Sequence, residues 1–419
     1  MNKETLIRVI LENQDIAFAK EIISRNIHIP QTENITVLTG IRRCGKTYTL
    51  YELAKKYERT DILFLDFEDE RLVHLNLLDD YDIILDSYFT VYPEKTPVIF
   101  FDEVQNLKNW HLYLRRLHNR GFKIFVTGSN ANMLSREIAT QLKGKSLETR
   151  IFTFSFPEFL RLKNTTFSEK DKRINQPRIQ NRFSEYMMFG AFPEVIKAAE
   201  VDKRAVADNI YSMLFYKDLV AKFGKEEYLL KLIVSKIAEN VTKEFSISSL
   251  AKKIISVYPS SIPTITEYFN ILQEPYLTAS IYPFRESFVQ RQAKRKTYLT
   301  DNSFIFLNRI SEDKSRLFEN LVFQFLERTN NEVFYYRTNN GQEVDFLVRT
   351  QNKQTLIQAC SYPDNADTLA REIKAIIAAM NELRLSSGII YTIEAEGEEI
   401  IGGKKVEIIP LWRAMLAGI

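Results

Sequence analysis

The sequence predicts an α/β protein whose first part is a parallel β-sheet with helices on both faces. Strands that alternate with helices form parallel sheets, because each helix carries the chain back to the same edge of the sheet. A helical lead-in covers residues 1 to about 30. The expected strands lie in ITVLTG (35–40), DILFLDFED (61–69), PVIFFDE (97–103), FKIFVTGSN (122–130) and RIFTFSF (150–156).

The first strand leads into a phosphate-binding loop, GIRRCGKT, which begins at Gly40 and ends at Lys46 and Thr47. Glycines let the backbone wrap phosphate groups with its N–H donors, and the following helix N-terminus favours negative charge. Lys46 is placed to neutralise the β- and γ-phosphates, and the Thr47 hydroxyl to hold Mg²⁺. We therefore expect the chain to bind ATP or GTP. The expected nucleotide-binding residues are Gly40, Arg43, Gly45, Lys46, Thr47 and Tyr48.

A second motif ends the third strand, where PVIFFDE places Asp102 and Glu103 after four apolar residues. We expect Asp102 to hold Mg²⁺ through water, and Glu103 to polarise the attacking water as general base. An extra strand between the phosphate loop and the acidic strand is typical of P-loop proteins that use a catalytic glutamate. A protein that hydrolyses its nucleotide is therefore favoured over a passive binder.

The fourth strand ends in small polar residues that would lie beside the γ-phosphate. Ser129 is the leading candidate for a residue that senses this phosphate, with Asn130 and Thr127 behind it. A helix N-cap formed by Ser129 or Asn130 remains an alternative, and one side chain can serve both roles. The expected catalytic residues so far are Lys46, Glu103 and Ser129.

The composition limits the remaining possibilities. The chain has 419 residues, of which 45% are hydrophobic, so it can form several domains with their own cores. Its net charge of +3 neither implies nor excludes nucleic-acid binding, which must come from a local patch. Two cysteines, Cys44 and Cys360, cannot make a disulfide framework or a zinc site. We found no apolar run long enough for a membrane span and no signal-peptide core, so a cytoplasmic protein without membrane contact is expected.

Beyond residue 165 the alternation of strands and helices stops. Residues 228–305 show a helix, a short strand, two more helices and a strand pair, which is the order of a winged-helix domain. The segment VQRQAKRKTYL would place Arg291, Lys294, Arg295 and Lys296 in the wing, where they could contact DNA phosphates. A solvated basic surface is the alternative explanation of such a run.

With these residues in view, the chain resembles a large family of prokaryotic AAA+-type ATPases that carry a C-terminal restriction-endonuclease-like domain. The resemblance rests on GIRRCGKT, FFDEVQN, TGSNANML, GAFPE and GQEVDFLV, and it covers nearly the whole chain. It implies an α/β fold in which a P-loop NTPase sheet is followed by a winged-helix domain and a nuclease-like α/β domain. The expected domains are 1–165 (ATPase with its lead-in), 166–227 (helical lid or linker), 228–305 (winged helix) and 306–419 (nuclease-like).

The chain departs from this family at the expected arginine finger. Relatives often carry a Gly-Arg pair before the SF turn, whereas this chain has Gly144 and Lys145. Arg150 or Arg136 would then act in its place, and Arg150 completes the expected catalytic set.

A second departure lies in the nuclease-like domain. An active site of that fold holds Mg²⁺ with an aspartate and a Glu-x-Lys motif on the next strand. Asp345 and the helix residue Glu319 match, but Gln358 and Cys360 stand in place of the glutamate and lysine. Because Mg²⁺ prefers anionic oxygen ligands, we expect this site to be degenerate and nuclease activity to be absent.

The expected function is ATP hydrolysis by a DNA-binding protein that uses ATP and Mg²⁺. The resemblance implies a homo-oligomer, such as a hexameric ring. Branched DNA such as a four-way (Holliday) junction is a reasonable target, because nuclease-like folds occur in junction resolvases, although this step is analogy. One alternative is a nucleotide-dependent switch that binds a protein partner in signalling or defence. Another is an ATP-regulated nuclease.

Overall fold

The computed structural model describes residues 2–72, 81–128, 144–165, 176–284, 287, 294–307, 313–329, 331–351, 353–361 and 366–418. These residues form two units, 1–153 and 154–419, and each is described by itself. The first unit ends at Thr153, so helix α6 (Phe156–Leu162) belongs to the second unit. The first unit is therefore shorter than the ATPase domain expected over residues 1–165.

The first unit contains the expected parallel sheet. Its strands are β1 (Ile35–Thr39), β2 (Ile62–Asp66), β3 (Val98–Asp102), β4 (Ile124–Thr127) and β5 (Ser146–Arg150), in the order β2-β3-β4-β1-β5. Every neighbouring pair in this sheet is parallel. The prediction of a parallel sheet is confirmed, and β4 is the strand that separates the phosphate-loop strand from the acidic strand. The fifth strand begins at Ser146, earlier than the segment 150–156 predicted for it.

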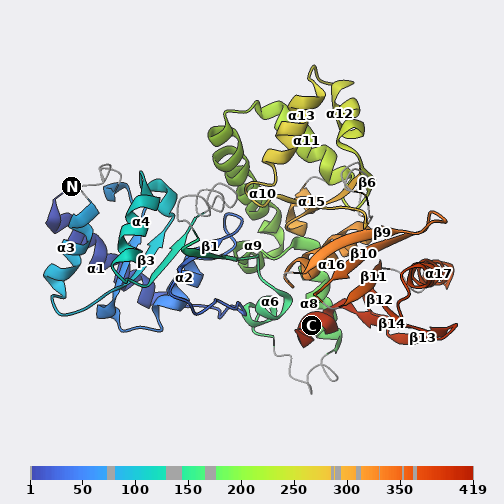
Figure 1. The fold of residues 1–419 in the computed structure, drawn as a ribbon, viewed down its shortest axis with the longest axis horizontal. Coiled ribbons are helices and arrows are strands. Elements are labelled where there is room, and N and C mark those ends of the chain that lie inside the picture. Colours follow the sequence, from blue (N-terminus) through green and yellow to red (C-terminus); the bar gives the residue numbers. More distant parts are fainter. Residues whose placement is uncertain are drawn as a thin grey trace. The chain divides into compact units, whose positions relative to one another are not determined.

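Helices cover both faces of this sheet (Figure 1). On one face, side chains of α1 (Lys3–Ala19), α3 (Asp82–Val91) and α4 (Trp110–Asn119) pack with alternate residues of the strands in one core. On the other face, α2 (Lys46–Ala54) packs through Tyr51 against Phe64, which stacks on Phe100. Strand side chains alternate between faces, so continuous apolar strands serve both cores.

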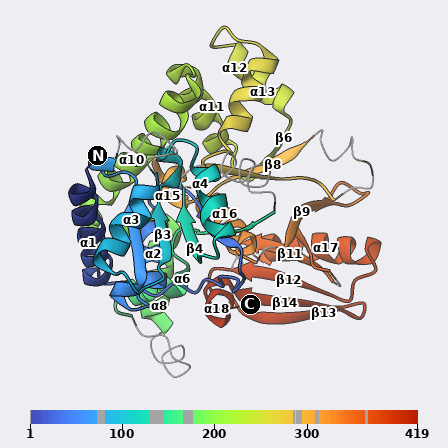
Figure 2. The ribbon, with the colours of Figure 1, turned by 60° about the vertical axis from the view of Figure 1, so that its left-hand side comes forward.

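The second unit begins with a group of helices, which are coloured green in Figures 1 and 2 apart from α15. They are α6, α8 (Gln176–Phe189), α9 (Pro193–Lys197), α10 (Lys203–Met213) and α15 (Asn302–Leu307), with a π-helix over Leu214–Ala221. Asp301 ties them together by accepting hydrogen bonds from the Ala191 and Ser303 backbone amides, both at 3.0 Å. The GAFPE turn is thereby held against α15.

Residues 227–299 show the predicted order of elements. They form α11 (Glu227–Glu239), β6 (Glu244–Phe245), α12 (Ile247–Ile255), α13 (Ile262–Ile271), β7 (Thr278–Ile281) and β8 (Arg295–Leu299). Side chains of Ser246 and Ser261 cap α12 and α13, as Ser does at helix N-termini. The three strands form an antiparallel sheet in the order β6-β8-β7. Its assignment as a winged helix remains a prediction.

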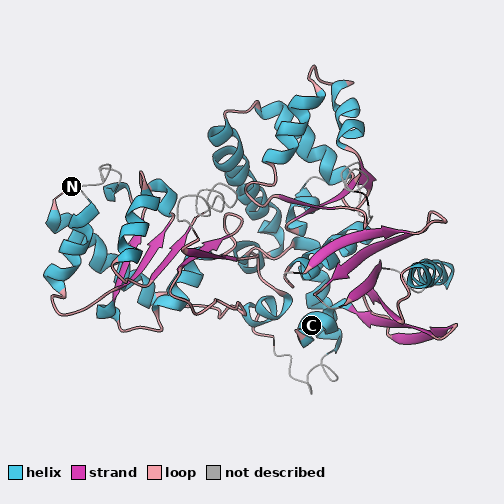
Figure 3. Cartoon of the chain, in the orientation of Figure 1, coloured by secondary structure: helices cyan, strands magenta, loops and turns pink. Residues whose placement is uncertain are grey.

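The C-terminal part is a six-stranded mixed sheet in the order β13-β14-β12-β11-β10-β9 (Figure 3). Its elements are α16 (Lys314–Glu327), β9 (Glu332–Arg337), β10 (Glu343–Arg349), β11 (Gln354–Cys360), α17 (Ala366–Glu382), β12 (Ser387–Thr392), β13 (Gly397–Ile401), β14 (Lys404–Pro410) and α18 (Leu411–Ala417). Residues of α17 such as Ile376 and Met380 share one core with β10, β11 and β12. The nuclease-like assignment of this part also remains a prediction.

Candidate nucleotide-binding site

The phosphate loop lies between β1 and α2, as its sequence predicts. Gly40 has φ 149°, and a Cβ there would collide with the Ile151 carbonyl oxygen. Gly45 has φ 104°, a conformation that side chains disfavour, and it precedes the first turn of α2. Both glycines are therefore required by the path of the backbone, and the loop presents the α2 N-terminus to an anion.

The side chain of Lys46 lies within the phosphate loop. This side chain is buried, and Nζ donates hydrogen bonds to the carbonyl oxygens of Gly40 at 3.1 Å and Ile41 at 3.3 Å. These contacts hold the ammonium at the loop, where a phosphate could replace the carbonyl groups as acceptor. The geometry fits the phosphate-binding role predicted for Lys46.

Asp102 is buried at the carboxyl end of β3, where it accepts hydrogen bonds from the hydroxyls of Thr127 and Thr47. Burial and the neighbouring charge of Glu103 raise the pKa of Asp102 to about 7, although the two hydroxyl hydrogen bonds oppose the shift. Asp66 pairs with Asp102 across β2 and β3, and its pKa is also raised, chiefly by burial. The Asp102 carboxylate and the Thr47 hydroxyl are hard oxygen groups of the kind that suit Mg²⁺.

Glu103 follows the strand in a conformation that is uncommon for glutamate. Its φ of 49° lies in the left-handed region, and its backbone N–H donates to Thr127 Oγ1 at 2.9 Å. Gln105 Nε2 donates to the Glu103 carboxylate at 2.5 Å, and only 8% of Glu103 is exposed. Unfavourable backbone conformations persist where the surroundings hold them and are frequent in active sites. The structure thus places this carboxylate firmly beside the buried acid.

Thr127 connects the two acidic residues, since its hydroxyl donates to Asp102 and accepts from the Glu103 amide. Thr127 is one of the two residues that stand behind Ser129 as sensor candidates in the sequence. Ser129 and Asn130, the other two, lie outside the described residues, as does Arg136. The sensor assignment to Ser129 therefore remains a prediction.

Arg25 is a site residue that sequence reasoning missed. Its guanidinium donates to the carbonyl oxygens of Cys44 at 3.0 Å and Phe152 at 2.7 Å, which joins the phosphate loop to the segment after β5. Its backbone amide donates to the Glu52 carboxylate of α2. A single arginine in an irregular segment carries no motif, so no sequence signal could identify it.

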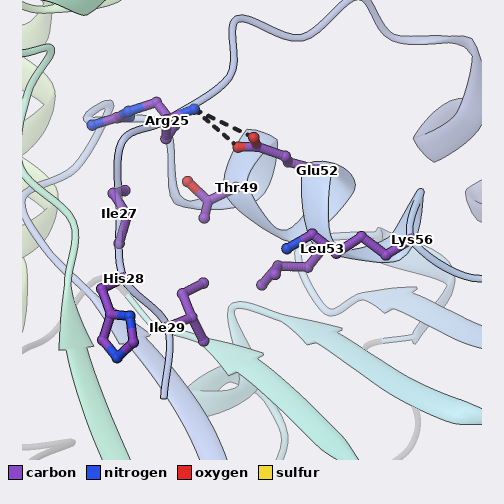
Figure 4. Close-up of a pocket in the computed structure, with 8 residues that line it drawn as sticks. All are labelled: Arg25, Ile27, His28, Ile29, Thr49, Glu52, Leu53 and Lys56. Carbon is purple, nitrogen blue, oxygen red and sulfur yellow. Dashed lines mark hydrogen bonds between the residues drawn. The ribbon is translucent and has the colours of Figure 1, made fainter. Parts of the chain in front are cut away.

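A pocket of about 220 Å³ adjoins this arginine (Figure 4). It lies between the extended segment before β1 and the helix that follows the phosphate loop. Ile27, Ile29 and Leu53 supply apolar surface, and His28, Glu52 and Lys56 supply polar groups. Polar and apolar groups thus share the lining, so a bound molecule would contact both kinds of surface.

The remaining predicted residues of this site lie on its periphery. Arg43 is exposed and has φ 69°, and Tyr48 is 44% exposed on α2, with its ring edge-on to that of Tyr51. Arg150 pairs with Thr39 at the end of β1, and its guanidinium lies 4.4 Å from the centre of the Phe152 ring. Arg150 therefore lies near the phosphate loop of its own chain, which leaves its role as a finger untested.

The structure corrects the prediction for two of the four basic wing residues. Lys296 is buried and paired with carboxylates, and Arg295 is buried with its guanidinium 5.5 Å from the Phe269 ring and 5.2 Å from the Tyr282 ring. Both residues belong to β8, whose five residues are all buried, so these two cations do not face solvent. Lys294 is half-exposed and pairs with Glu244 at 2.7 Å, and Arg291 lies outside the described residues.

The four residues of the expected degenerate nuclease site lie on α16, β10 and β11 as predicted. The Asp345 amide donates to Gln358 Oε1 at 3.0 Å, and Gln358 Nε2 donates to Glu372 at 2.5 Å. Gln358 is thus committed to a hydrogen-bonded structural role, and Cys360 is buried in the adjoining core. Within the described ranges, no three His, Cys, Asp or Glu side chains are arranged to hold a metal ion.

Comparison with known families agrees with this geometry. A family model described as an AAA domain matches residues 32–160, which contain the phosphate loop and the acidic strand. Two models described as domains of unknown function, DUF8612 and DUF4143, match residues 180–313 and 314–414. Residues 32–160 therefore match an AAA domain, in which the phosphate loop and the acidic strand lie. None of the described helices is long and apolar enough to cross a membrane.

Full-length relatives define the family more narrowly. The chain is 33% identical to the uncharacterized protein MJ1544 of Methanocaldococcus jannaschii, over 97% of this chain and 93% of that protein. It belongs to the same family as MJ1544. An uncharacterized protein of Haemophilus influenzae is 28% identical over 83% of this chain and 89% of its own length.

Two solved structures are similar to parts of the chain. The Walker-type ATPase PABY2304 of Pyrococcus abyssi has a TM-score of 0.43 and 14% identity, over 74% of this chain and 96% of that one. AMPPCP-bound DnaA from Aquifex aeolicus has a TM-score of 0.25 and 14% identity, over 64% and 86% of the two chains. Both similarities are weak, so neither bears on the function of this protein.

Proposed function

We propose that this protein hydrolyses ATP with Glu103 as the general base and acts on DNA. The proposal that Glu103 is the general base rests on the position of this residue. Hydrogen bonds with Thr127 and Gln105 hold Glu103 beside Asp102. A glutamate fixed in this way can orient and deprotonate a water without reorganising during the reaction.

The nucleotide would be held by the loop, with Lys46 on its phosphates. Thr47 and Asp102 would hold Mg²⁺, which supplies neutralisation of the phosphate charge. Burial raises the pKa of Asp102 to about 7, and a bound cation would favour its ionised form. The pocket lined by Ile27, Ile29 and Leu53 would hold the adenine ring of the nucleotide. Its lining includes residues of α2, the helix that begins at the phosphate loop.

The DNA part of the proposal rests on α12 and α13 in place of the buried wing residues. Lys252 and Lys253 are exposed on α12, and Ser261 and Thr264 lie at the N-terminus of α13. Cations and a helix N-terminus bind phosphate groups, which supply most of the affinity of proteins for DNA. The order of elements in residues 227–299 also supports a winged-helix role, with branched DNA as the analogy-based target.

An ATPase assay with single-stranded, duplex and four-way-junction DNA tests this function. We expect DNA to stimulate turnover, and Lys252→Ala with Lys253→Ala to flatten the slope of log affinity against log salt by about 2 on duplex DNA. The matched control is Lys353→Ala with Lys374→Ala, two exposed lysines of the C-terminal part. ATP turnover that no DNA form changes, together with no DNA binding at low salt, would contradict the DNA part while leaving the ATPase part intact.

A second candidate is a nucleotide-dependent switch that binds a protein. It is favoured by exposed apolar side chains on the same helical region: Tyr228 is 55% exposed, Val257 70% and Ile262 40%. Exposed apolar side chains that lie together are typical of protein-binding sites, and the ring of Tyr228 lies 5.4 Å from that of Tyr258. A switch should hold nucleotide with slow turnover, and DNA should leave that turnover unchanged.

A further inference from the structure

Three carboxylates of the C-terminal part surround one lysine from a different sheet. Lys296 Nζ lies 3.0 Å from Glu319 Oε1, 2.8 Å from Glu343 Oε1 and 3.0 Å from Asp345 Oδ1. An ammonium group has three N–H donors, so each donor has one carboxylate oxygen. Only 2% of the lysine side chain is exposed, so these ion pairs are shielded from solvent.

The surrounding elements explain how this centre forms. Lys296 and Tyr298 alternate along β8 and therefore share one face of that strand, and Tyr298 donates to Glu319 Oε1 at 3.0 Å. Glu343 and Asp345 likewise share one face of β10. The backbones are joined nearby, because the Tyr335 amide donates to the Tyr282 carbonyl oxygen at 3.1 Å. The lysine thus enters the acidic centre from a strand that is docked beside it.

The charges at this centre do not balance. Glu319, Glu343 and Asp345 carry three negative charges when ionised. Lys296 and Arg337 supply two positive charges, and Arg337 pairs with Glu343 at 2.8 Å. The fully ionised group therefore carries a charge of −1. A single ammonium therefore compensates these acids only in part, whereas a divalent cation would add one more positive charge.

We propose that Lys296 is a built-in cation that occupies the position of a divalent metal among Glu319, Glu343 and Asp345, excludes metal from it and holds β8 against the C-terminal sheet. The ammonium lies 2.8 to 3.0 Å from the three oxygens. Ca²⁺ binds oxygen at about 2.3 to 2.6 Å and Mg²⁺ at about 2.0 to 2.1 Å. If the lysine were removed, the site would need less contraction for Ca²⁺ than for Mg²⁺.

The contact also gives Lys296 a structural role. Removing one partner from a buried ion pair leaves uncompensated charge and is strongly destabilising. Loss of Lys296 would leave three carboxylates facing one another, of which Asp345 is buried and Glu319 and Glu343 are partly buried, so the contact that holds β8 to this part of the chain would be lost. The same contact removes Lys296 from any DNA-binding surface.

The test is Ca²⁺ binding to the full-length Lys296→Ala variant without nucleotide, measured by titration calorimetry and by the thermal unfolding midpoint. We expect one additional Ca²⁺ per chain and a midpoint that is lowered in EDTA and raised by Ca²⁺. Mg²⁺ should bind more weakly. Wild-type protein and the control Lys294→Ala, which alters the half-exposed neighbouring lysine, should show neither effect.

A second variant keeps the inference testable if Lys296→Ala does not fold. Lys296→Met with Glu319→Gln removes one cation and one acid, so the group keeps the charge of the native centre and two carboxylates that can still bind Ca²⁺ more weakly. Adding Asp345→Asn to either variant should abolish the response. If both folded variants bind no more Ca²⁺ than wild type, or if wild type already binds a Ca²⁺ that Asp345→Asn removes, the inference is wrong.

Discussion

Substitution of Asp102 by Asn should stabilise the nucleotide-free protein, and by more as the pH rises. Asp102 is buried at the end of β3, and burial raises its pKa from 3.8 to about 7. Between these values the folded state holds a proton that the unfolded state has released, so folding stability falls as the pH rises through this window. Asparagine cannot ionise and still offers an oxygen to Thr127 and Thr47, so the variant lacks this pH-dependent loss.

The size of the effect follows from the same pKa values. At about 1.4 kcal/mol per pKa unit, the full shift from 3.8 to about 7 corresponds to about 4 kcal/mol above pH 8. At pH 5 the cost is already about 2 kcal/mol, because the unfolded carboxyl is mostly ionised there. The advantage of Asp102→Asn should therefore grow by about 2 to 3 kcal/mol between pH 5 and pH 8, which is roughly 5 to 10 °C in the unfolding midpoint of a unit of this size.

The assay is thermal unfolding of wild type and Asp102→Asn from pH 5 to pH 8, with EDTA and without nucleotide. Asp86→Asn, at an exposed position on α3, controls for the loss of an acid from the same unit. A difference between Asp102→Asn and wild type that stays constant over this range would refute the reasoning, because the buried carboxyl would then not be the source of the pH dependence.

Further predictions concern ligand binding and turnover. Lys46→Ala should abolish binding of a fluorescent ATP analogue, because Lys46 provides the positive charge inside the phosphate loop. Arg25→Met should weaken that binding about tenfold through loss of the contacts that join the loop to the segment after β5, whereas the control Arg59→Met should not. Arg150→Ala should lower ATP turnover with little change in nucleotide affinity, and a fully active monomer by light scattering would exclude a finger acting between subunits. No DNA form should be cut with Mg²⁺ or Mn²⁺, and cleavage that Asp345→Ala removes would contradict this.

The candidate nucleotide site could be predicted from the sequence because its motifs are local. The phosphate loop and the acidic strand are each contiguous, and their chemistry depends on spacing along the backbone. Continuous apolar strands likewise indicated a parallel sheet with both faces covered. The start of β5 was misplaced because residues 146–149 are polar or only partly buried, which gives a weak strand signal.

The features that the sequence did not predict depend on contacts between segments that are distant in the chain. Arg25 reaches the phosphate loop from an irregular segment, and Asp66 meets Asp102 through the register of β2 and β3. The basic run at residues 291–296 predicts a wing surface, whereas Lys296 is buried among three carboxylates. A run of charges does not reveal which face of a strand is buried, since that depends on its partners.

Single-turnover ATP hydrolysis by Glu103→Gln tests the central claim most directly. The amide keeps the size of the side chain but cannot accept a proton, so we expect nucleotide affinity close to that of wild type and hydrolysis slowed by about a hundredfold or more. Glu94→Gln, at an exposed position in the same unit, should hydrolyse ATP normally. Hydrolysis by Glu103→Gln at the wild-type rate would show that another group activates the water and would contradict the proposed mechanism.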